Sequence, residues 1–160
     1  MLFNKPEELD RGELAILAAL QVNARLSTQD LADEVGLSSS ATWRRVKALE
    51  DRGMIQGYVA MLDAEKLGFK ECIFAHVTLA KHDVKSIEEF ERSVARRPEV
   101  LECFSVAGQS DYVLRVVVRS NGEYEKFLKD AVFSCAAVGH IHSSFTLRKV
   151  KFSMSLPVAT

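Results

Sequence analysis

The sequence predicts an α+β protein of two domains: a helical N-terminal domain, then a domain in which one sheet packs against two helices. Apolar residues recur at helical spacing up to about residue 53, whereas strand-like alternation begins near Leu67. The 160 residues, 48% hydrophobic and 27% charged, suffice for one ordinary domain or two small ones and exclude a disordered chain.

The first two predicted elements are helices. One spans about Asp10 to Val22, with an apolar stripe formed by Leu9, Leu14, Ile16, Leu17 and Leu20. The next begins after Ser27, whose hydroxyl suits an N-cap, and ends at Gly36. Its inward residues are Leu31, Ala32 and Val35.

A third helix is predicted from about Ser39 to Arg52, capped by Ser38 and stopped by Gly53. Its inward positions are Thr42, Val46 and Leu49. About three residues, one of them glycine, separate it from the second helix, which is typical of a helix-turn-helix whose second helix reads DNA. An αα-hairpin without a nucleic-acid role fits the spacing equally well.

The segment after the third helix is rich in apolar residues: Met54, Ile55, Tyr58, Val59, Met61 and Leu62. It predicts one or two short strands around Gly57, where a wing would lie. The domain boundary is expected near Asp63 to Gly68. We therefore assign residues 1–66 to the first domain, with the helix-turn-helix at about 28–47, and residues 67–160 to the second.

The second domain is predicted to alternate strands and helices in the order β-α-β-β-α-β: Phe69 to Ala80, Ser86 to Ala95, Leu101 to Ala107, Asp111 to Arg119, Tyr124 to Cys135, and Ile141 to Phe152. This is the ferredoxin-like split βαβ arrangement, in which two helices cover one face of a four-stranded sheet. Val113 and Val117 make the other face apolar as well, so we expect a partner subunit to cover it. On the last strand, Ile141, Phe145 and Leu147 should share one face.

Net charge carries little information at the scale of domains. The chain has a net charge of −1, and residues 1–66 hold 8 Lys and Arg against 11 Asp and Glu. Between Ser38 and Leu49, however, Arg44, Arg45 and Lys47 occur without any acidic residue. Phosphate affinity depends on such local placement, so the third helix is the candidate DNA contact, with a solvated helix face as the alternative.

Three further classes of protein are not indicated. Cys72, Cys103 and Cys135 lie about thirty residues apart with no CxxC pair, which predicts free thiols. No apolar run approaches the ~18 residues of a spanning helix, and the N-terminus does not resemble a signal peptide, so we expect a cytoplasmic protein with no membrane partner.

No enzyme chemistry is predicted either. The sequence has no Ser-His-Asp order, glycine-rich phosphate loop or close carboxylate pair, so we assign no catalytic residue and no cofactor. His140 and His142 share a strand face and form a conceivable metal pair, but no nearby cysteine or carboxylate completes it, and no metal is predicted. His76, in the middle of a strand, is expected to be packed or to lie in an interface.

Three stretches together resemble the Lrp/AsnC family of transcriptional regulators: LSTQDLADEVGLSSSATWRRVKALE, VAGQSDYVLRVVV and SSFTLRKVKFSMSLP. The resemblance covers nearly the whole chain. It implies a winged helix-turn-helix regulator of double-stranded DNA that forms homodimers, assembles into octamers, and responds to a small free amino acid. Two departures occur, Ser-Ser-Ser-Ala-Thr at 38–42 in place of Ser-Pro-Thr-Pro-Cys, and Ala136-Ala137 in place of a Pro-Gly turn.

The expected DNA contacts are Ser27, Thr28, Ser38, Ser39, Ser40, Arg44, Arg45 and Lys47. Arg44 is expected to read guanine N7 and O6, and Lys47 to bind phosphate. Arg45 matches a position that is usually arginine in the family, and we assign it to phosphate contact or to anchoring of the helix. Trp43, the single tryptophan, is expected to pack on the first helix.

The expected effector site consists of Ala107, Gly108, Gln109, Ser110, Asp111, Tyr112, Val138 and His140, with the last two drawn from one subunit or its neighbour. The resemblance identifies Gly108 and Asp111 with the family's ligand loop. Asp111 can accept from the ammonium of an amino acid, and Gly108 lets backbone N–H groups approach the carboxylate. In the alternative, Gly108 permits a tight hairpin and Asp111 caps it.

Two other functions remain open at this point. A small enzyme built on the sheet domain, as in acylphosphatase-like proteins, would need an arginine and an asparagine at a phosphate-binding loop, and the sequence has no such loop. A chromatin organiser that binds DNA without an effector would share every DNA-binding feature. A response to amino acids distinguishes the regulator from the organiser.

Overall fold

The computed structural model describes residues 8–158, which divide into two compact units. Of the described residues, one unit contains 8–61 together with 151–158, and the other contains Leu62–Val150. The predicted division at residue 66 assigned the end of the chain to the sheet domain. In the structure, the residues from Lys151 on instead belong to the unit that holds the helices.

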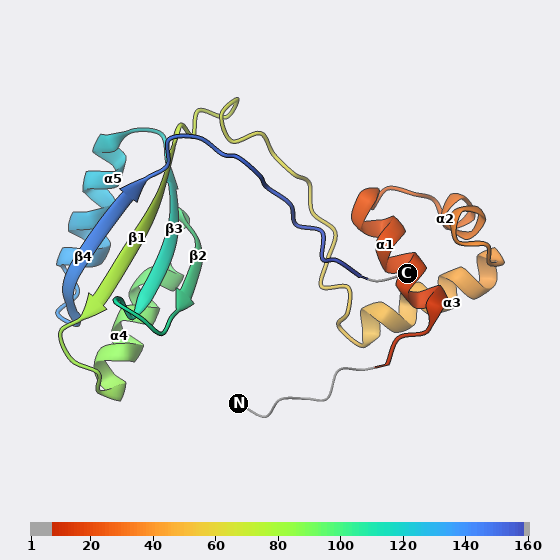
Figure 1. Cartoon of the computed structure of the whole chain (residues 1–160), viewed down its shortest axis with the longest axis horizontal. Coiled ribbons are helices and arrows are strands. Elements are labelled where there is room, and N and C mark those ends of the chain that lie inside the picture. Colours follow the sequence, from red (N-terminus) through yellow and green to blue (C-terminus); the bar gives the residue numbers. More distant parts are fainter. Residues whose placement is uncertain (1–7, 159–160) are drawn as a thin grey trace. The chain divides into compact units, whose positions relative to one another are not determined.

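The helical unit contains α1 (Arg11–Val22), α2 (Thr28–Val35) and α3 (Ser39–Asp51), drawn in red to orange in Figure 1. Each begins at an N-cap whose side chain accepts a backbone N–H three residues on: Asp10, Ser27 and Ser38. Its core is small and consists of Ile16, Ala19, Leu31 and Leu49, with eight half-buried apolar residues around them. The three predicted helices are thus confirmed, with bounds within one residue.

The predicted wing strands are absent from the described residues of this unit. Residues 55–63 have no regular secondary structure, and Tyr58, Val59, Met61 and Leu62 are exposed. The apolar pattern was real, but a strand needs a hydrogen-bonded neighbour, and this segment has none in the described part of the chain.

The second unit is built on a four-stranded antiparallel sheet with the strand order β2-β3-β1-β4. The strands are β1 (Glu71–Leu79), β2 (Val100–Ser105), β3 (Tyr112–Val118) and β4 (Val138–Phe145). Helix α4 (Val84–Ala95) connects β1 to β2, and α5 (Asn121–Phe127) with the π-helical turn η1 (Leu128–Phe133) connects β3 to β4. This order confirms the predicted ferredoxin-like arrangement.

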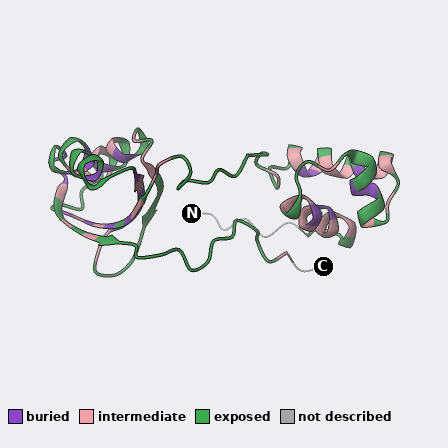
Figure 2. Cartoon of the chain, turned by 90° about the horizontal axis from the view of Figure 1, so that it is seen from above, coloured by how far each residue is buried: buried purple, intermediate pink, exposed green. Residues whose placement is uncertain are grey.

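Helices α4 and α5 cover one face of the sheet, and the core lies between the two layers (Figures 1 and 2). Alternate residues of β1 and β3 enter this core: Ile73, Ala75, Val77 and Leu79, and Tyr112, Leu114, Val116 and Val118. Phe90 of α4 and Phe127 of α5 fill it from the helical side. The other residues of these strands point to the face that the helices do not cover.

Strand β4 is shorter than predicted. It ends at Phe145, which is paired with Ile73 of β1, and the N–H of the next residue, Thr146, donates to the Cys72 carbonyl at 3.0 Å. Leu147, predicted to share a strand face with Ile141 and Phe145, instead lies beyond the end of β4 and is 100% exposed. The apolar alternation continues past the point where β4 stops pairing with β1. The sequence pattern alone therefore overestimated the length of the strand.

The start of β4 contains a bulge opposite Thr78 and Leu79 of β1. Here Gly139 approaches the neighbouring backbone so closely that a Cβ on it would lie 3.0 Å from the Ala80 nitrogen. The Ala80 N–H donates to the Ala137 carbonyl at 2.8 Å beside it. Glycine at 139 is therefore required by close packing of the two strands.

Candidate functional site

Helices α2 and α3 form the expected helix-turn-helix pair. Gly36 ends α2 in the left-handed conformation, with a φ of 70°, and only residues 36–38 connect the helices. Ser38 starts α3 by accepting the Ala41 N–H at 3.3 Å, and its hydroxyl lies 3.3 Å from that of Ser40. The turn is thus determined by a glycine and a cap, which are both local features of the sequence.

The other hydroxyls predicted to contact DNA also hold the helices in place. Ser27 accepts the Asp30 N–H at 3.1 Å and donates to the Asp30 carboxylate at 2.7 Å. The Ser39 hydroxyl donates to the side-chain oxygen Oε1 of Gln29 at 2.5 Å, which joins the start of α3 to α2. Thr28, the first residue of α2, is exposed.

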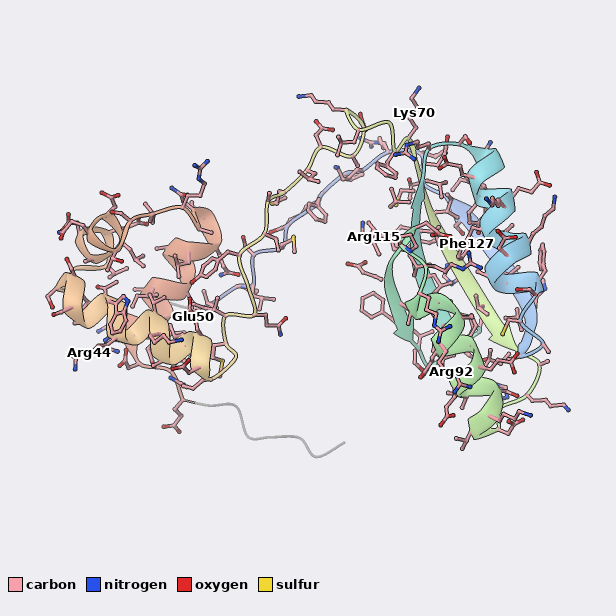
Figure 3. The ribbon with its side chains drawn as sticks, turned by 180° about the vertical axis from the view of Figure 1, so that it is seen from behind. Arg44, Glu50, Lys70, Arg92, Arg115 and Phe127 are labelled. Carbon is pink, nitrogen blue, oxygen red and sulfur yellow. The ribbon has the colours of Figure 1, made fainter. Side chains whose placement is uncertain are left out.

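The three basic residues of α3 differ in what they contact. Arg44 is exposed, projects away from the helical core (Figure 3), and has no ion-pair partner in the part of the chain that the structure describes. Lys47 pairs with Asp51 at 2.9 Å, one turn further along the same helix. Arg45 donates to the carboxylate of Asp10, which is the N-cap of α1. Of the three, only Arg44 is available without breaking an intramolecular ion pair.

Arg45 therefore links α3 to α1. Its guanidinium lowers the pKa of the Asp10 carboxyl below the usual value, and Asp10 in turn raises the pKa of Arg45. A second ion pair, from Arg52 to Glu13 at 2.6 Å, joins the other end of α3 to the same helix. Of the two roles considered for Arg45, this geometry supports anchoring of the helix.

Trp43 is 59% exposed on α3, although it was expected to pack on α1. Its ring contributes to a hollow of about 180 Å³ that Leu20 of α1, Thr28 and Leu31 of α2, and Tyr58 also line. Trp43 thus reaches the edge of α1 but leaves more than half of its surface open.

The hairpin between β2 and β3 contains most of the predicted effector residues. Ala107, Gly108 and Gln109 are exposed at its tip, while Ser110 and Asp111 are half-buried. One oxygen of the Asp111 carboxylate accepts the Leu79 N–H at 2.7 Å, and the other lies 2.9 Å from Nε2 of His82. The hydrogen bond from the Leu79 N–H lowers the pKa of the Asp111 carboxyl most, and the contact with His82 lowers it further.

Tyr112 points into the core, away from the hairpin surface. Its ring lies 4.7 Å from that of Phe90, and its hydroxyl donates to Glu91 of α4 at 2.8 Å. Burial, together with the neighbouring Glu91 carboxylate, raises the pKa of Tyr112 to about 12. In this structure the side chain is thus part of the connection between β3 and α4.

Val138 and His140 lie at the same end of the sheet as this hairpin, but on the opposite side of β1. Leu79 of β1, which donates to Asp111, is paired with Val138, and Thr78 is paired with His140. Strands are spaced ~4.8 Å apart, so β3 and β4 are about 10 Å from each other at this end. The end of β1 therefore separates the two groups of predicted residues.

The open face of the sheet combines apolar and histidine side chains. Phe104 is opposite Val113, and Phe74 is 38% exposed. His76 and His142 are paired across β1 and β4, with ring centroids 6.1 Å apart. Across the described residues, no group of three or more His, Cys, Asp or Glu is arranged to hold a metal ion.

Three residues of these sites were not identified from the sequence. His82 and Leu79 bond to Asp111, and Asp10 bonds to Arg45, across 29, 32 and 35 residues of chain respectively. No local pattern connects residues so far apart. Only the N-cap role of Asp10 had a local signal, in the Glu13 that completes a capping box.

The chain matches two known domain families. Residues 9–56 match the winged helix-turn-helix DNA-binding family, and residues 72–156 match the Lrp/AsnC ligand binding domain. In the described part of the chain, no helix is both long and apolar enough to span a membrane.

Curated relatives and solved structures agree with these matches. The Bkd operon transcriptional regulator of Pseudomonas aeruginosa is 41% identical, over 94% of this chain and 99% of the relative. The DNA-binding transcriptional activator DecR of Escherichia coli is 37% identical, over 94% and 99%. A transcriptional regulator of Neisseria meningitidis, solved in complex with L-methionine, is 36% identical with a TM-score of 0.89, over 94% of this chain and 97% of that one.

Proposed function

This chain belongs to the Lrp/AsnC family of DNA-binding transcriptional regulators, and from that premise we propose that it binds specific DNA sequences under the control of a free amino acid. The family is not enzymatic. The observation that carries the proposal is the likeness to the Neisseria regulator bound to L-methionine, which extends over both domains. A regulator of the chromosome works where the DNA is, so we place the protein in the cytoplasm.

DNA recognition is assigned to the outer face of α3. Arg44 is the base-reading residue because it is exposed and has no competing carboxylate among the described residues. Ser39 and Ser40, at the start of the same helix, and Ser27, Thr28 and Ser38 at the neighbouring helix ends, are assigned to phosphate contacts. Lys47 must leave Asp51 to bind phosphate, so its contribution is the smaller one.

The protein is proposed to act as a homodimer that assembles further, up to the octamer. Support comes from the open sheet face, where Val113, Val117, Phe74 and Phe104 would otherwise contact water. A symmetric dimer binds a near-palindromic operator, with half-sites about one helical turn (~34 Å) or a multiple of it apart. Footprinting on the operator measures this spacing directly.

The amino-acid effector is assigned to the exposed hairpin around Asp111. Its two oxygens each accept one hydrogen bond, whereas a carboxylate offers about four acceptor positions, so an ammonium group can still bind. Backbone N–H groups near Gly108 are assigned to the effector carboxylate. Val138 and His140 are about two strand spacings (~10 Å) from Asp111, so their place in the site is at its far side or in a neighbouring subunit.

The experiment that tests this function combines two measurements on the full-length protein. A thermal-shift screen of the twenty amino acids, with L-methionine among them, identifies ligands that bind the folded state. Fluorescence anisotropy with operator DNA then measures whether the ligand changes the dissociation constant. Stabilisation together with altered DNA binding supports the regulator. DNA binding that no amino acid alters indicates instead a chromatin organiser without an effector.

A further inference from the structure

The chain does not end at the sheet. After Thr146, the residues from Leu147 to Leu156, here named the C-terminal strap, have no regular secondary structure. Apolar residues alternate with polar ones along most of the strap, at Val150, Phe152, Met154 and Leu156. Their side chains are 50 to 79% exposed. The strap is thus an extended segment whose apolar side chains are largely open to solvent.

One end of the strap is attached to the sheet and the other to the DNA-binding unit. At its start, the N–H and hydroxyl of Thr146 both donate to the Cys72 carbonyl of β1, at 3.0 and 2.9 Å. At its end, the side-chain amide of Gln21 contacts both backbone groups of Leu156. Its Nε2 donates to the Leu156 carbonyl at 3.2 Å, and its Oε1 accepts the Leu156 N–H at 2.6 Å.

The Gln21 carboxamide thus satisfies both backbone groups of one residue, because it donates to the carbonyl and accepts from the N–H of Leu156. The residues of a neighbouring strand would bind the backbone of Leu156 in the same way. Gln21 lies in the last turn of α1, and the residues from Lys151 on form one compact unit with the helices. Helix α1 is in turn joined to α3 by the ion pairs Asp10–Arg45 and Glu13–Arg52. A continuous series of contacts therefore leads from the strap to the helix that carries Arg44.

We propose that Gln21 is a positioning residue that fastens the strap to α1, so that β4 and the recognition helix are connected by a second route besides the linker after α3. This inference rests on the proposed function, because its consequence is regulatory. The effector residues Val138 and His140 lie on β4, whose C-terminal end continues into the strap. An effector that favours one position of the end of β4 then changes how often the Gln21 clamp is closed.

The expected coupling is modest because the clamp consists of two exposed hydrogen bonds. Such bonds exchange readily with water, so a closed and an open state can both be populated. A coupling of this size changes DNA affinity by about five- to tenfold, at the lower end of the usual range for allosteric effects.

The test uses the full-length variant Gln21→Met, which keeps the length of the side chain and its helix propensity but removes both hydrogen bonds. Gln56→Met is the matched control, since Gln56 is an exposed glutamine outside regular structure. Gln21→Glu keeps only the acceptor for the Leu156 N–H and should be intermediate. A chain that ends at Met154 removes the clamp from the other side.

The first readout is the change in operator affinity caused by saturating L-methionine, or by the strongest ligand of the thermal-shift screen. We expect Gln21→Met to bind operator DNA and ligand within twofold of wild type, but to lose at least two thirds of the ligand-induced change. A wild-type response in Gln21→Met overturns the inference and leaves the proposed function intact. A wild-type protein without any response overturns both.

The second readout needs no effector. Trypsin can cut the strap after Arg148, Lys149 and Lys151, and release of the clamp should increase the rate of this cleavage several-fold in Gln21→Met but not in Gln56→Met. An unchanged cleavage rate shows that Gln21 does not hold the strap and overturns the inference. Gln21→Met and the chain that ends at Met154 remove the same contact. The combination of the two changes should therefore reduce the ligand-induced change in operator affinity no further than either change alone.

Discussion

The helical unit and the sheet unit hold their functional side chains by different means. Among the described residues, the helical core contains four buried apolar residues, against sixteen in the core of the sheet unit. The recognition helix compensates with contacts near the surface, namely its cap at Ser38 and the ion pairs of Arg45 and Arg52. In the sheet unit the core positions the backbone, and Asp111 lies at the edge of a rigid framework.

Each function can therefore be altered at a different place in the molecule. Surface ion pairs are weak and screened by salt, so the position of α3 responds to small perturbations. A large core resists such perturbations, so we expect the structure of the sheet unit to change only at the edges of the sheet and at its open face. Single-residue variants of the two units test this contrast.

The largest effect is expected on the open face of the sheet. Val117→Glu introduces a charge at a half-buried position of β3, and burying it against a partner would be costly, so we expect dissociation or insolubility. Light scattering after size exclusion measures the mass. Val84→Glu, at a 71% exposed position of α4, is the control and should leave the mass unchanged. A soluble Val117→Glu variant of wild-type mass would show that this face is covered in another way.

The second prediction concerns the small helical core. Leu49 is fully buried there, and Leu49→Ala should reduce the unfolding free energy of the helical unit by about 2–5 kcal/mol. Trp43, the only tryptophan, lies in this unit, so its fluorescence follows unfolding of the helices, while far-UV circular dichroism follows both units. We expect the fluorescence transition to move to lower denaturant and the sheet transition to stay. A common shift of both signals would show that the two units unfold together.

The third prediction separates the basic residues of α3. Arg44→Ala should reduce discrimination at one base pair by about 1–3 kcal/mol, because it removes a base contact. Lys47→Ala should weaken binding to all DNA sequences alike and reduce the salt dependence of the affinity. Both effects should be smaller than those of replacing an unpaired lysine, because Lys47 is bound to Asp51. Binding titrations on operator variants at two salt concentrations measure both. Wild-type binding by both variants would contradict the helix-turn-helix assignment.

The smallest effect is expected for Asp111. Its pKa is lowered in the folded protein, chiefly by the Leu79 N–H and then by His82. The stabilisation is therefore present above the unfolded-state pKa of about 3.9 and is lost as pH falls through the lower folded-state value. Asp111→Ala should lower the melting temperature by a few degrees at neutral pH and flatten its decline below about pH 4.

Asp111→Ala also distinguishes the two roles of this residue. If Asp111 binds the ligand, its replacement abolishes the change in DNA affinity that the amino acid causes, while the dimers persist. As a structural residue only, its loss leaves the response in place at the same effector concentration. Calorimetric titration of the variant with the effector decides between the two.

Local features were predictable because their causes lie within a few residues. Ser27, Ser38 and Gly36 act on the nearest turn of helix, so caps and helix ends could be predicted from the sequence. The same holds for the alternation that predicted the faces of β1 and β3. Two predictions that needed a distant partner were wrong: in the part of the chain that the structure describes, neither the segment after α3 nor residues 146–152 form a strand.

The sequence by itself therefore determined the two-domain α+β architecture, the helix-turn-helix and its exposed Arg44. Periodicity, caps and turn residues encode these features within short stretches of chain. The folded chain was needed to show that Arg45 anchors α3 to Asp10, that Leu79 and His82 contact the Asp111 carboxylate, and that Gln21 binds Leu156 across 135 residues. Such contacts depend on how the chain folds back on itself, and a hydrogen bond leaves no periodic signal at either of its ends.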